Sequence, residues 1–209
     1  MTCEGCGANT DPSCRVGTDG VALCEACRLR FGVQHEYEKR LPELARLLRV
    51  GDFQGALESI QATQQALSAQ DLDGWVARAT LADKALVLQE QGRWAEALEA
   101  NEARLALHFD DASEKITSLL GAAAALRALG RKAEATARVQ ATLDCLEKAH
   151  PQAALPALLT CLQAGEDVAL ADRPSLVGGA LGAYDLRPPM DVHADPLGAL
   201  KWAQQNWRQ

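Results

Sequence analysis

Two Cys-x-x-Cys pairs near the start of the chain constrain its fold more than any other feature. Cys3 and Cys6 form the first pair, Cys24 and Cys27 form the second, and seventeen residues separate the pairs. Four thiolates at this spacing suit one tetrahedral zinc ion of the structural kind. We therefore expect these four cysteines to hold a single structural Zn²⁺.

The residues around the two pairs support this interpretation. Gly5 and Gly7 flank Cys6, where a metal-binding knuckle needs a tight backbone turn. Residues 17–20 (GTDG) carry a hairpin-turn signal. Residues 24–30 (CEACRLR) are typical of the first turns of a helix, whose N-terminal dipole favours thiolates nearby. The expected order is therefore a knuckle, a short hairpin and a helix.

This arrangement is a treble clef, and it resembles a GATA-type zinc finger. Residues 3–8 (CEGCGA) are similar to the first knuckle of that family, and residues 23–27 (LCEAC) are similar to its second. The resemblance covers about residues 3–31 and implies the zinc-bound fold. Members that read DNA have a tryptophan near the position of Cys14 and a basic tail after the helix, whereas residues 31–39 here are not basic.

A second pattern follows the cysteine pairs. Between residues 35 and 165, apolar residues recur at steps of three and four, which indicates helices. Similar segments begin at Gly51 (GDFQGAL), Gly92 (GRWAEAL) and Gly130 (GRKAEAT), 41 and then 38 residues apart. One turn glycine in each period of this length predicts stacked helical hairpins, with the glycine in the left-handed conformation that ends a helix. The expected helices are residues 41–50, 52–68, 71–91, 93–108, 111–129, 131–149 and 151–165.

The three segments resemble the turn between the paired helices of tetratricopeptide repeats, a family whose period is usually about thirty-four residues. The resemblance implies an all-α, TPR-like solenoid in which the first helix of each pair lines a groove for a peptide or a partner helix. Helix phase makes Gln89, Glu90, Thr117 and Arg127 the candidate residues for partner binding.

The last part of the chain changes character. Residues 166–194 contain several prolines and glycines, which predicts an extended segment along the solenoid or a partner. Asp195 and Pro196 are suited to begin a helix that continues through Trp207. We expect this helix to cap the array, with docking on another subunit, as in a homodimer, as the alternative. The expected domains are a four-cysteine finger, a helical-repeat region and this C-terminal part, at residues 1–32, 35–165 and 166–209.

Composition and motifs limit the classes of function that fit the chain. The net charge is −7 and no segment is basic, which argues against broad phosphate-driven binding of nucleic acid. We expect no membrane span and no secretory signal, and the paired cysteines fit a reducing cytoplasm. A high alanine content with few lysines is typical of proteins from GC-rich bacterial genomes.

No HExxH, nucleophile elbow or phosphate loop is present, so we expect no enzymatic activity.

The favoured function is therefore that of a non-enzymatic adaptor, with a structural zinc finger and a groove that binds another protein or peptide. The alternative is a DNA-binding regulator that uses the GATA-like finger, with Arg15, Arg28 and Arg30 as candidate nucleic-acid contacts. A third reading is a redox or metal sensor, suggested by the additional thiol of Cys14.

Overall fold

The computed structural model confirms the all-α class. Its one strand pairing in the described residues is a two-residue antiparallel ladder, in which β1 (Arg15–Val16) pairs with β2 (Val21–Ala22). The chain divides into two compact units, residues 1–87 and 88–209. The structure describes residues 3, 15–16, 21–22, 24–71, 73–109, 112–147 and 151–207.

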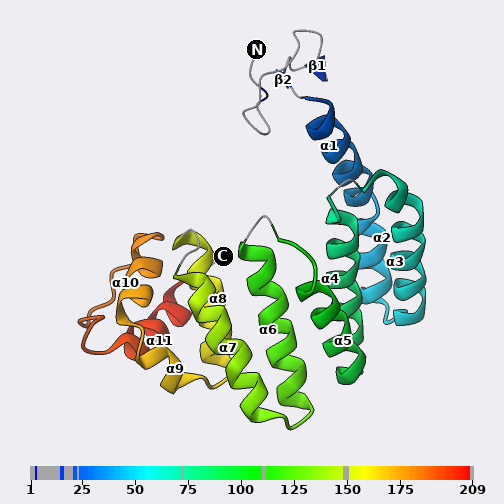
Figure 1. The fold of residues 1–209 in the computed structure, drawn as a ribbon. Coiled ribbons are helices and arrows are strands. Elements are labelled where there is room, and N and C mark those ends of the chain that lie inside the picture. Colours follow the sequence, from blue (N-terminus) through cyan, green and yellow to red (C-terminus); the bar gives the residue numbers. More distant parts are fainter. Residues whose placement is uncertain are drawn as a thin grey trace. The chain divides into compact units, whose positions relative to one another are not determined.

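In its described residues the first unit contains four α-helices after the ladder, with a short 3₁₀ helix, η1, before the last of them (Figure 1). Their bounds are α1 (Glu25–Glu38), α2 (Leu41–Arg49), α3 (Phe53–Leu67), η1 (Ser68–Gln70) and α4 (Trp75–Glu90), of which α4 continues into the second unit. Val33 and Tyr37 of α1 are buried with Leu67 and Val76 in one apolar cluster. The Tyr37 hydroxyl also donates a hydrogen bond to Asp83 of α4. These contacts hold α1, which contains Cys27 and is preceded directly by Cys24, against the helices that follow it.

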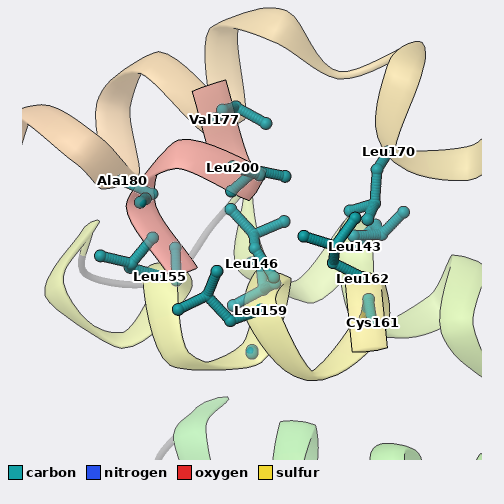
Figure 2. Packing of buried hydrophobic residues seen from close by; sticks show 14 of the residues in the cluster. Leu143, Leu146, Leu155, Leu159, Cys161, Leu162, Leu170, Val177, Ala180 and Leu200 are labelled. Atoms are coloured by element: carbon teal, nitrogen blue, oxygen red, sulfur yellow. The ribbon is translucent and has the colours of Figure 1, made fainter. Parts of the chain in front are cut away.

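The described part of the second unit contains seven further helices. Their bounds are α5 (Trp94–Leu105), α6 (Ala112–Ala128), α7 (Lys132–Leu146), α8 (Pro151–Gln163), α9 (Asp167–Ala171), α10 (Pro174–Gly182) and α11 (Pro196–Asn206). Figure 2 shows the main apolar core, in which Leu143 of α7 and Leu155 of α8 lie with Val177 of α10 and Leu200 of α11. All four side chains are fully buried. No helix among the described residues is long and apolar enough to cross a membrane.

Four helices end in the same glycine turn. At Gly130 the N–H donates to the Arg127 carbonyl at 2.9 Å, and the next N–H donates to the Leu126 carbonyl at 2.9 Å. This pair of bonds is the Schellman motif, which satisfies the last carbonyls of a helix. The motif recurs, always with positive φ, at Gly51, Gly92, Gly130 and Gly165. The left-handed glycines predicted at the first three positions are confirmed, and the fourth, which ends α8, was not predicted.

Replacing Gly130 by alanine should destabilise the protein by about 1–2 kcal/mol, the cost of a left-handed alanine. The φ of Gly130 is +76°, and an added Cβ would meet no atom within 4 Å, so the cost is purely conformational. Gly179→Ala is the matched control, because Gly179 lies inside α10 with equal space and without a positive φ. That change should leave stability equal or raise it by up to about 1 kcal/mol. Urea unfolding measures both, and equal shifts for the two variants would contradict the prediction.

The prediction of an extended segment at residues 166–194 is wrong for its first half, where the chain forms α9 and α10. Leu170 of α9 and Leu181 of α10 are buried in the main core, and this burial outweighs the weak helix propensity of the glycines. Pro174 lies in the first turn of α10, where a missing N–H costs nothing. Residues 183–195 contain no helix.

The C-terminal helix α11 begins where the sequence indicated. The Asp195 side chain accepts a hydrogen bond from the Gly198 N–H at 2.8 Å and so caps the helix. Ala199, Leu200 and Ala203 of α11 are fully buried in the main core of the same chain. The apolar face of α11 therefore packs within its own unit.

Candidate metal centre and groove

Three cysteine sulfurs come together at the start of α1. The Sγ atoms of Cys3, Cys24 and Cys27 all lie within 4.8 Å of one another. Sulfurs around a tetrahedral zinc stand about 3.8 Å apart when each Zn–S bond is about 2.3 Å. The three sulfurs can therefore hold a metal ion after small movements. Cys6, the fourth predicted ligand, and Cys14 lie outside the described residues.

The start of α1 explains why two of these sulfurs face the same point. Cys24 is the N-cap residue and has an extended backbone, and Cys27 lies in the first helical turn. The Cys24 side chain does not cap the helix, so its sulfur remains directed to the cluster. The Cys24 backbone N–H donates to the sulfur of Cys3 at 3.2 Å. A backbone N–H donated to a cysteine sulfur is the kind of contact that orients a metal-ligating sulfur.

The cysteines of the second unit have a different environment. Cys161 is 1% exposed within the main core, and burial, reinforced by the charge of Glu166, raises the pKa of its thiol to about 11. It therefore remains a neutral thiol at physiological pH and acts as a small apolar residue. Cys145 is half-buried against the same core.

The candidate nucleic-acid contacts have ordinary surface environments where they are described. Arg30 of α1 forms an ion pair with Asp73, with 3.2 Å between its Nε and a carboxylate oxygen. Arg28 is exposed on the same helix, and Arg15 belongs to β1. A guanidinium already paired with a carboxylate attracts a phosphate less strongly than a free one, so Arg30 is the weakest of these candidates.

Two of the four predicted partner-binding residues line one groove of about 550 Å³ in the second unit. Gln89 contributes from the end of α4 and Thr117 from α6, and the Gln89 side-chain amide donates to the Gly121 carbonyl at 3.2 Å. Glu90 is exposed and Arg127 forms an ion pair with Glu166, and neither lines the groove. The full lining is Gln89, Ser113, Ile116, Thr117, Leu120, Gly121, Ala124, Pro156, Ala157 and Thr160.

The α8 side of this groove was not predicted. Pro156, Ala157 and Thr160 come from α8, which ends at the glycine turn of Gly165. Residues 166–171 (EDVALA) follow this turn and contain no aromatic residue, unlike the segments that begin at Gly51 and Gly92. The groove-lining parts of α4, α6 and α8 belong to helices that each end in a Schellman glycine. The glycine at the end of each helix was the sequence feature from which the α8 side of the groove could have been predicted.

Comparison of the chain with protein-family models, curated proteins and solved structures finds no match. The functional proposal therefore depends on the cysteine cluster and the groove themselves.

Proposed function

We propose that this protein is a non-enzymatic adaptor whose helices form a TPR-like solenoid and whose groove binds a peptide or helix of another protein. The groove lined by α4, α6 and α8 carries the proposal. In a stack of helical hairpins the first helix of each pair lines the concave face. The glycine turns support this assignment, because α4, α6 and α8 each precede one and would each be the first helix of a pair.

The chemistry of the groove suits a peptide. Ala124 and Ala157 are small, so the backbone of a partner can approach the helices closely there. Gly121 instead leaves room for the Asn101 side chain of α5. Thr117 and Thr160 are exposed, and their hydroxyls, which donate to the Ser113 and Pro156 carbonyls, can still accept hydrogen bonds from a partner. None of the described lining residues is charged, so we expect recognition by them to depend on shape, apolar contact and neutral hydrogen bonds.

The N-terminal cysteines complete the proposal. We infer that Cys6 joins Cys3, Cys24 and Cys27 in a closed Cys₄ site for one structural Zn²⁺. When bound, the ion cross-links the segment before β1 to the start of α1. Because all four coordination positions are filled by protein, such a site supports the fold and leaves no position for a substrate.

A bulky charge in the groove tests the proposed function. Ala124→Arg places a long cation at an exposed position of the groove. We expect the variant to capture at least roughly nine-tenths less partner, which corresponds to a loss of about 1.4 kcal/mol of binding free energy. Ala133→Arg is the matched control, because Ala133 is exposed on α7 outside the groove lining. Quantitative mass spectrometry of proteins that co-purify from the source cells measures the effect. Equal capture by both variants, or no partner for the unaltered chain, would refute the groove as the binding site.

A further inference from the structure

The threonine hydroxyls of the groove are arranged to accept hydrogen bonds from a partner. Thr117 of α6 and Thr160 of α8 both line the groove and are exposed. Each hydroxyl donates its single proton to the carbonyl four residues earlier in its own helix, at 3.0 Å in both cases. A hydroxyl that has donated its proton can only accept a further hydrogen bond. These two positions therefore suit N–H or O–H donors of a partner.

Gln89 of α4 adds an acceptor from the third helix of the groove. Its Nε2 donates to the Gly121 carbonyl at 3.2 Å, and only the nitrogen end of an amide can face a carbonyl oxygen. This bond fixes the amide group, so Oε1 is directed away from the Gly121 carbonyl. Oε1 has no hydrogen bond with the described residues and is reached by solvent. Because Gln89 lines the groove, its Oε1 is available to a donor held there.

The groove offers no counter-charge to a cationic donor. None of its described lining residues is an acid or a base. Among the charged residues next to the lining in sequence, Glu114 is paired with Arg104, whereas Glu90 and Lys115 are exposed and have opposite charges. A lysine or arginine side chain would lose hydration in the groove without gaining a charged partner. Neutral donors fit better, and every residue except proline carries one in its backbone N–H.

The backbone of a bound helix cannot supply these donors. Beyond its first turn, the N–H groups of a helix are bonded to its own carbonyls. A helix binds through an apolar face instead, with anchors at i, i+3, i+4 and i+7. The large apolar residues of the lining are Ile116, which is already buried, and Leu120 and Pro156, which are half-buried. Little apolar surface is left for a helix, whereas an extended segment brings free N–H groups.

We propose that the partner lies in the groove as an extended segment whose backbone N–H groups donate to Gln89, Thr117 and Thr160. This inference rests on the proposed function of the groove and narrows its occupant to one backbone conformation. Helices in contact lie about 8–10 Å apart, so a chain that crosses from α4 to α8 needs about five or six residues at roughly 3.3 Å each. In an extended chain the N–H groups of alternate residues point to the same side.

Backbone methylation of a bound peptide tests the proposal. Displayed linear peptides of about twelve residues are selected on the full chain and counter-selected against Ala124→Arg, which retains the peptides that need the groove. Each peptide is then synthesised with one N-methyl group at successive positions, and calorimetry gives its Kd. Methylation should weaken binding at least roughly tenfold at alternate positions within a stretch of about five or six residues. Equal loss at consecutive positions, as for a helix whose internal bonds are broken, would overturn the extended segment.

Gln89→Met removes the amide at nearly constant side-chain length and should weaken peptide binding roughly three- to tenfold. Gln140→Met is the matched control, because the Gln140 amide also donates one hydrogen bond, to Asp144 at 3.0 Å, and lies outside the groove lining. Similar far-UV circular dichroism of the two variants verifies that both are folded. Equal Kd values for both variants would refute the role of Gln89.

Thr117→Val replaces an exposed hydroxyl by a methyl group of similar size and should weaken binding roughly three- to tenfold. Thr136→Val is its control, because Thr136 is exposed on α7 outside the groove lining. Peptides that require Ala124 but bind Gln89→Met and Thr117→Val normally would overturn the extended segment and leave the groove as a binding site. Failure to select any peptide that requires the groove would refute both proposals.

Discussion

Cys24→Ser is expected to abolish stoichiometric zinc binding. Cys24 is the N-cap of α1, and its sulfur is one of the three that already lie within 4.8 Å of one another. A serine hydroxyl does not ionise at neutral pH, so the site loses one anionic ligand. Structural zinc in finger peptides contributes roughly 10–16 kcal/mol of apparent binding free energy at pH 7, so loss of a ligand should weaken zinc binding by orders of magnitude.

Elemental analysis after dialysis against a mild chelator measures this effect, with one zinc per chain expected before the change and almost none after it. Far-UV circular dichroism should remain strongly helical, because the apolar clusters of α2–α3 and of the second unit contain no cysteine of the metal cluster. Cys145→Ser is the matched control, because Cys145 is a half-buried cysteine of the second unit, outside the metal cluster. Retention of one zinc by Cys24→Ser, or equal loss from both variants, would contradict the proposed site.

Leu158→Ala should cause a large loss of stability in the second unit. Leu158 of α8 is completely buried in the main core, which joins α7 and α8 to α9, α10 and α11. Truncation removes apolar burial and leaves a cavity, and buried leucine-to-alanine changes typically cost about 2–5 kcal/mol. Because the short helices α9 and α10 depend on this core, their amides should lose protection from hydrogen exchange first.

The matched control for this prediction is Leu129→Ala. Leu129 is 40% exposed next to the Gly130 turn, so the same truncation should cost no more than about 0.5 kcal/mol. Urea unfolding of the second unit compares the two variants directly. A cost below about 1 kcal/mol for Leu158→Ala would mean that α8 is not central to the core.

The helices from residue 41 to 163 were predictable because their signals are local. The region expected to be helical at residues 111–129 is α6, Ala112–Ala128, and the region expected at 131–149 begins as α7 at Lys132. The spacing of apolar residues indicates which face of a helix will be buried, and a glycine in the turn indicates a positive φ, which other residues avoid. Both depend on a few neighbouring residues, so neither needs the tertiary structure.

The segments that were missed lack such local signals. Residues 31–38 contain Gly32 and many polar side chains, yet α1 continues to Glu38 because Val33 and Tyr37 are buried against α3 and α4. Likewise α10 contains three glycines and is held as a helix by the core around Val177. Burial against distant residues supplied the free energy in both places.

The sequence by itself determined the all-α class, the glycine turns at Gly51, Gly92 and Gly130, and the cysteine types and spacings from which a metal site can be built. Only the tertiary structure brought Cys3 to Cys24, across twenty-one positions of the chain, and placed Gln89 beside Gly121. It also joined α4, α6 and α8 into one groove. Local preferences are encoded in neighbouring residues, whereas sites assembled from distant residues depend on which apolar faces find one another during folding.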